Sequence, residues 1–66
     1  MNKISVGIDA YGHNLKEMLK SVRQALKAVE VAIDRREAEG GQFNSGCHSQ
    51  TVNDNTFMDI EYIKLK

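Results

Sequence analysis

The sequence predicts a small α+β domain in which one long amphipathic helix covers a sheet, in the chain order strand, helix, strand. Three observations predict this class. Apolar residues alternate with small or polar ones over residues 3–9, and helix-forming residues run without Gly or Pro over residues 15–39. Aromatic and β-branched residues then return over residues 56–65. No internal repeat divides the 66 residues, so we expect a single domain.

The first strand, residues 3–9, places Ile4, Val6 and Ile8 on one face, which we expect to be buried. The helix has a start signal, because Asn14 stands three residues before Glu17, the spacing of a capping box. It has a stop signal in the glycine pair at positions 40 and 41. These signals predict a helix over residues 15–39.

The helix carries an apolar face that we expect to pack on the sheet. At 100° per residue, seven large apolar side chains and two alanines fall within an arc of about 140°. The members of this arc are Leu15, Met18, Leu19, Val22, Ala25, Leu26, Val29, Ala32 and Ile33. Arg36 follows inside the same arc, so burial is expected to stop near Ile33.

Beside this face runs a charged stripe that is positive in its first half and negative in its second, the reverse of what a helix dipole favours. Its members are Lys16, Lys20, Arg23, Lys27, Glu30, Asp34 and Glu37. Two antiparallel copies of the helix would pair Lys16 with Glu37, Lys20 with Asp34 and Arg23 with Glu30. The two-fold axis would then lie near Leu26 and Lys27. The alternative is that this stripe faces solvent and forms ion pairs only between residues three or four positions apart on the same helix.

A third row, Ser21, Ala25, Ala28 and Ala32, consists of small side chains at helical spacing. Small residues let another helix approach closely, so we assign Lys20, Arg23, Ala25, Ala28, Glu30 and Asp34 to an expected interface between copies. The alternative is that the alanines are present only because alanine favours helix formation.

Residues 40–55 are rich in Gly, Asn, Ser and Gln and predict a polar loop. A loop of this length is either a recognition element or mobile, and both interpretations stay open. If the loop is ordered, Phe43 is its expected anchor. The last strand, residues 56–65, places Met58, Ile60 and Tyr62 on one face.

Self-association is expected because two strands and one helix form too small a sheet to stand alone. The single Cys excludes an internal disulfide, so a second copy of the chain would complete the sheet, giving four strands in a dimer with both helices on one face. A homo-oligomer, with a dimer favoured, is therefore predicted.

Charge and hydropathy exclude several classes of function. Nine Lys and Arg balance nine Asp and Glu, which makes nucleic acid an unlikely partner. No apolar run is long enough to cross a membrane, and no secretory signal is present, so a cytoplasmic protein without a membrane partner is expected.

The best candidate for a ligand site is the turn before the helix, formed by Tyr11, Gly12, His13 and Asn14. A helix N-terminus exposes amides that bind anions, and Lys16 and Lys20 would add positive charge. The plain alternative is a capped turn without a ligand.

Cys47 and His48 are adjacent in sequence, and the only other His is His13. This spacing matches no zinc pattern and no arrangement of a thiol nucleophile with its base. We therefore expect no metal, no cofactor and no catalytic residue, and assign Phe43, Cys47 and His48 only to partner or ligand binding.

The sequence thus favours a non-enzymatic, homo-oligomeric binding module that acts on an unknown protein partner, as small inhibitors and accessory proteins do, many of them encoded by phages and mobile elements. One alternative is a protein that sequesters a small anionic ligand, such as a nucleotide, between subunits. A weak nucleic-acid binder that uses the basic half of the helix is the third interpretation.

Overall fold

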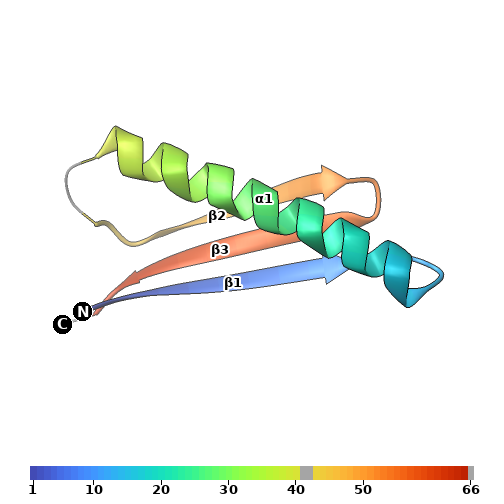
Figure 1. The fold of residues 1–66 in the computed structure, drawn as a ribbon. Coiled ribbons are helices and arrows are strands. Elements are labelled where there is room, and N and C mark those ends of the chain that lie inside the picture. The colour runs from blue at the N-terminus through green and yellow to red at the C-terminus, as the bar shows by residue number, and fades with distance from the viewer. Residues whose placement is uncertain (41–42, 66) are drawn as a thin grey trace.

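The computed structural model describes residues 1–40 and 43–65 and places one helix across one face of a three-stranded antiparallel sheet (Figure 1). The helix bounds agree with the prediction, and both predicted strands are present. The elements in chain order are β1 (Asn2–Ala10), α1 (Leu15–Glu39), β2 (Gly46–Asn53) and β3 (Thr56–Lys64). The α+β class is therefore confirmed.

The predicted polar loop over residues 40–55 is wrong in its second half, because that part forms β2. Positions 41 and 42 of that loop lie outside the described residues. β2 joins β3 through a turn at Asp54 and Asn55, where the Asn55 N–H donates to Asn53 Oδ1 at 2.9 Å. Such an Asx turn closes a hairpin between two antiparallel strands.

The strand order is β1-β3-β2, so the C-terminal strand is the centre of the sheet and not an edge. Ile4 lies opposite Tyr62 and Val6 opposite Ile60 on one side of β3, while His48 lies opposite Ile60 on the other. The expectation of only two strands in each chain is corrected. Two chains joined edge to edge would therefore form six strands.

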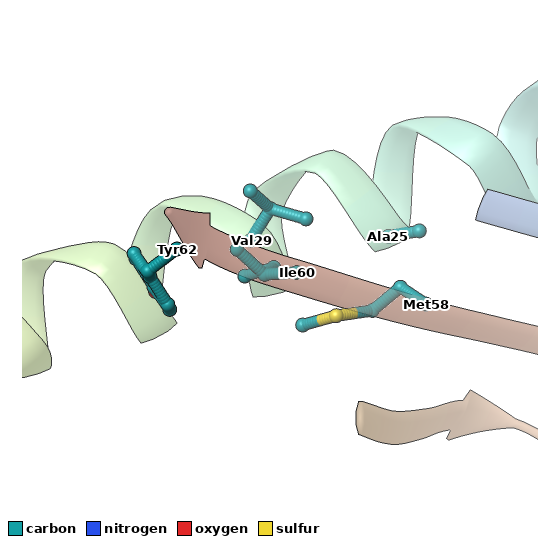
Figure 2. Close-up of a cluster of buried hydrophobic side chains, with 5 residues drawn as sticks. All are labelled: Ala25, Val29, Met58, Ile60 and Tyr62. Atoms are coloured by element: carbon teal, nitrogen blue, oxygen red, sulfur yellow. The ribbon is translucent and has the colours of Figure 1, made fainter. Parts of the chain in front are cut away.

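The core lies between α1 and β3. Ala25 and Val29 of the helix meet Met58, Ile60 and Tyr62 of the strand, and all five are buried (Figure 2). Small residues on the helix face large residues on the strand, which lets the two layers come close without voids. The predicted burial of the β3 face is confirmed.

The predicted orientation of the helix is wrong by part of a turn. Leu15, Leu19 and Leu26, which were assigned to the core, are 81%, 49% and 53% exposed, whereas Ala25 has no exposed surface. The physical reason is that the row of small residues, not the leucines, fits against the large side chains of β3. The leucines are thereby turned to the side of the helix.

The first strand is also less covered than expected. Ile4 and Val6 point to the helix side of the sheet but remain 45% and 43% exposed, and only Ile8 is half-buried among the three. Figure 1 shows why: α1 crosses the sheet diagonally, and its C-terminal half runs above β2 and away from the start of β1. The predicted burial of Ile4 and Val6 is therefore corrected.

Burial does not stop at Ile33, because Arg36 closes the end of the core. Its guanidinium lies 3.9 Å from the centre of the Tyr62 ring, and its Nη2 donates to the Asn44 carbonyl at 2.6 Å. The ring of Phe43 meets Tyr62 edge to face at 6.2 Å between centroids. A cation stacked on an aromatic ring and bonded to a carbonyl fixes the segment that enters β2.

Thr56 offers a test of this core. Its side chain is fully buried, and its hydroxyl has no hydrogen-bond partner among the described residues. Because an unpaired buried hydroxyl costs about 1–3 kcal/mol, replacing it with an isosteric methyl is expected to stabilise the fold. Thr56→Val should raise the free energy of unfolding by about 1 kcal/mol in urea titration, and Thr56→Ser should lower it. A destabilised Thr56→Val variant would mean that the hydroxyl is paired.

Candidate functional site

A hollow of about 660 Å³ lies beside the first two turns of α1 and brings together four of the predicted site residues, Tyr11, Gly12, His13 and Lys20. Lys16 is not among the residues that line it. Glu17, Ser21, Gln24 and Asn55 complete the lining. The hollow is therefore polar and contains a carboxylate as well as the predicted ammonium group.

Two backbone amides at this hollow already have internal partners. Asn14 Oδ1 accepts the Glu17 N–H at 2.9 Å, and Glu17 Oε2 accepts the His13 N–H at 3.4 Å. The capping signal in the sequence is thus confirmed. An anion at these two amides would have to displace both oxygens, and at any amide of the first turn it would lie near the Glu17 carboxylate, which would repel it. The turn is better suited to capping the helix than to binding an anion.

The other three predicted partner-binding residues lie apart from this hollow. Phe43 packs at the opposite end of the sheet, on Tyr62. Cys47 and His48 are successive residues of β2, so their side chains point to opposite faces. Cys47 is exposed, and His48 Nε2 lies 3.1 Å from Gln50 Oε1. Within residues 1–40 and 43–65, no group of three His, Cys, Asp or Glu side chains is placed to hold a metal ion.

The face of the sheet that α1 does not cover is the larger candidate surface, and we call it the open face. Its side chains alternate with those of the core along each strand. They are Lys3, Ser5, Gly7 and Asp9 from β1, Cys47, Ser49 and Thr51 from β2, and Phe57, Asp59, Glu61 and Ile63 from β3. Sequence reasoning gave only Cys47 of these residues a binding role.

The open face combines apolar ends with an acidic centre. At one end, Tyr11 meets Phe57 edge to face at 6.3 Å between ring centroids, and both rings are exposed. At the other end, Ile63 precedes the exposed Leu65. Between them lie Asp59 and Glu61. Within the described part of the chain, the one ion pair is on the helix, so these carboxylates have no cationic partner of their own.

A second exposed apolar surface follows one side of α1, and we call Leu15, Leu19 and Leu26 the leucine flank. Leu19, Leu26 and Ile33 are spaced by seven residues and so lie nearly on one line along the helix. Ile33 lines a cavity with Ile4 of β1. The flank therefore lies on the β1 side of the helix.

The opposite side of α1 faces β2. Gln24 lies about 160° around the helix from Leu26, and its Oε1 accepts a hydrogen bond from Asn53 Nδ2 at 2.9 Å. This hydrogen bond fixes the rotation of the helix on the sheet. It also separates the leucine flank from β2, so the two edges of the sheet have different surroundings.

The six predicted interface residues separate into three groups. Arg23 and Glu30 are exposed beside the leucine flank. Asp34 is exposed about 80° around the helix from Leu26, slightly further from the flank than Arg23, while Lys20 lines the polar hollow. Ala25 is buried and Ala28 half-buried against the chain's own sheet, so neither has the surface that a second helix would need.

Within the described residues, no helix combines the length and the apolar character needed to cross a bilayer. Comparison of the chain with models of protein families, with curated proteins and with solved structures finds no match.

Proposed function

We propose that this protein is a small, homo-oligomeric, non-enzymatic binding module that acts in the cytoplasm by covering the surface of another protein. One observation carries the proposal. In the described residues five hydrophobic side chains are buried, while ten large apolar side chains are exposed, each by 42% or more. Some of these side chains lie together, with Tyr11 against Phe57 on the open face and the leucine flank along one side of α1, and contiguous apolar surface is typical of surfaces that contact other chains.

The open face supplies the chemistry of the contact with a different protein. Rings at one end and aliphatic side chains at the other flank a centre with two unpaired carboxylates, Asp59 and Glu61. A protein surface with Lys or Arg between apolar residues fits this pattern, because both the apolar ends and the charges would be matched. An inhibitor or accessory protein acts in this way by occupying a surface.

The two other interpretations have weaker support. A small anion at the helix N-terminus would compete with the cap and with Glu17, as described above. Nucleic acid would meet Lys16, Lys20, Arg23 and Lys27 on one half of a helix whose other half is acidic, so few phosphates would be neutralised. An excess of carboxylates on the open face would repel nucleic acid there as well.

Affinity capture with the immobilised full chain tests the proposal. The variant Phe57→Ser/Asp59→Lys removes one ring and reverses one charge on the open face. The matched control, Val31→Ser/Glu39→Lys, also removes one exposed apolar side chain and reverses one charge, at exposed positions of α1 that lie about 140° around the helix from Leu26. We expect one protein to be captured by the wild type and by the control, and its recovery to fall at least tenfold with the open-face variant.

The proposal is contradicted if neither wild type nor control retains a protein selectively, or if capture does not change with the open-face variant. Circular dichroism of both variants shows whether the fold is retained, and only folded variants enter the comparison. Capture that disappears between 50 and 200 mM salt, together with recovered nucleic acid, would instead favour the nucleic-acid interpretation.

A further inference from the structure

We infer that two copies of the chain pair β1 against β1 across a two-fold axis through Val6, giving a six-stranded sheet with two antiparallel helices on one face. The partner is thus a second copy, bound by the β1 edge and the leucine flank together. This inference deepens the homo-oligomeric part of the proposed function and rests on it. It uses the edge and the helix side, whereas contact with a different protein uses the open face.

The backbone N–H and C=O groups of β1 that do not bond to β3 include those of its apolar residues. At its two ends β1 bonds to the opposite segment through odd positions: the Leu65 N–H donates to the Met1 carbonyl at 3.1 Å, and the Tyr11 N–H donates to the Asn55 carbonyl at 2.8 Å. Because antiparallel pairing alternates along a strand, the even positions direct their N–H and C=O groups to the free edge. These include Ile4, Val6 and Ile8.

The sequence of β1 is complementary to itself when reversed about Val6. Val6 then lies opposite the partner's Val6, and Ile4 lies opposite the partner's Ile8, so that the half-exposed apolar residues cover one another on the helix side. On the open face, Lys3 lies opposite the partner's Asp9, which pairs opposite charges at both ends of the interface. All nine residues of the strand have partners in this register.

The same axis brings the two helices into contact. α1 contacts β1 and β3 more than β2, so its middle lies about one to one and a half strand spacings from the two-fold axis. With strands about 4.8 Å apart, the helix axes are about 10–14 Å apart, a separation that facing leucine side chains can span. The leucine flank of each helix is on its β1 side and therefore faces the partner's leucine flank above the two paired β1 strands.

An open cavity lies where the partner's leucine arrives. It has a volume of about 390 Å³, and its lining includes the apolar Ile4 and Ile33 and the charged Lys3, Arg36 and Glu37. In the antiparallel arrangement, Ile33 faces the partner's Leu19, and Glu37 faces the partner's Lys16. A half-exposed leucine would thus contact the apolar part of the cavity at Ile4 and Ile33, with the pair of opposite charges beside it.

Neither of the other exposed surfaces suits a second copy as well. The edge at β2 is polar, with His48 and Gln50 on the helix side, and its register with β3 is shifted between Thr51 and Asn53. A shifted, polar edge strand discourages pairing with another strand. Two open faces packed together would bring the carboxylates of Asp59 and Glu61 near their own copies.

Two matched helix variants test the leucine flank. Leu26→Glu and Val31→Glu each place a carboxylate at an apolar position of α1 that is about half exposed, but the two positions lie about 140° apart around the helix. We expect the dimer dissociation constant, measured by sedimentation equilibrium, to rise at least a hundredfold for Leu26→Glu and less than threefold for Val31→Glu. Equal effects of the two variants would overturn the inference.

Disulfide trapping tests the strand register and does not depend on those variants. Directly opposite residues at the axis have Cα atoms about 5.5 Å apart, within the range of a disulfide. The variant Val6→Cys/Cys47→Ser is therefore expected to form a covalent dimer on mild oxidation. The wild type, whose exposed Cys47 lies two strands away from the axis in each copy, also has one thiol per chain and is expected not to cross-link.

Rapid cross-linking of the wild type without cross-linking of the Val6→Cys/Cys47→Ser variant would overturn the pairing at β1. The proposed function fails separately: a dimer with this register that captures no protein refutes partner binding, whereas a monomer that still captures a protein through Phe57 and Asp59 refutes the self-pairing alone.

Discussion

The variant Ile60→Ala is expected to be largely unfolded at room temperature. Ile60 is 1% exposed, sits at the centre of the middle strand and is one of five hydrophobic residues that make up the buried core. Truncating a buried Ile to Ala costs about 2–5 kcal/mol, while the single core of a chain this short rarely supplies more than about 3–5 kcal/mol. Urea titration followed by circular dichroism, at a fixed protein concentration, measures the loss.

Ile63→Ala is the matched control for this prediction. Ile63 belongs to the same strand but points to the open face, where it is half-buried. Its truncation is expected to cost about 1 kcal/mol or less, because little surface is removed from contact. If both variants lose the same stability, the core does not lie where the structure places it.

Replacing Gly46–Asn53 with eight alternating Gly and Ser residues is expected to abolish the fold. The replacement keeps the chain length, so the connection from α1 to β3 can still be made. It removes the ladder on one side of the central strand and the contact of Val52 with the core. Gly and Ser have low β propensity and bury little surface, so β2 would not re-form.

Loss of dispersed amide signals in a proton–nitrogen NMR spectrum measures this outcome. A shorter change in the same segment provides the control: Ser49→Thr keeps a hydroxyl and raises β propensity, and it is expected to leave the spectrum dispersed. A dispersed spectrum from the Gly and Ser replacement would mean that residues 46–53 act as a loop, as their composition suggests.

Strong local signals made most of the fold predictable. Asn14 and Glu17 mark the start of α1, the glycine at position 40 marks its end, and the alternation of β1 and β3 sets their buried faces. Each of these signals arises from neighbouring residues, so it is visible in the sequence without knowledge of distant contacts.

β2 was missed because its pairing depends on β3 and not on its own apolar content. Its largest apolar residue is Val52, and its remaining positions are polar or small, as an edge strand with a solvent-exposed side allows. The signal that predicts it is the run Asn53, Asp54 and Asn55 directly before a clear strand. Such a run forms a tight turn, and a tight turn directly before a strand indicates that another strand precedes it and pairs with it.

The rotation of α1 was missed for a different reason. An arc of apolar residues about 140° wide does not say which part faces the sheet, and the large side chains of Met58, Ile60 and Tyr62 favour the alanine side. This choice depends on the volumes of two layers together, which no helix pattern contains. The leucine flank, and with it the β1-to-β1 pairing inferred above, could be recognised only once that rotation was known.

The candidate site was predictable in part, because some of its residues are close together in the sequence. Tyr11, Gly12, His13 and Lys20 are near one another in sequence or one helical turn apart, and the structure places them around one hollow. The open face joins three strands from distant parts of the chain, so its acidic centre and apolar ends depend on the register of β1 and β2 with β3.

Native mass spectrometry of the freshly purified, untagged protein is the most direct test of self-pairing, because one spectrum reports the number of chains and any bound mass. We expect a species at twice the 7.4 kDa chain mass with nothing added. A species at the single chain mass at micromolar concentration would contradict the self-pairing module proposed here. Extra mass of a few hundred daltons per chain would replace it with the ligand-sequestering alternative.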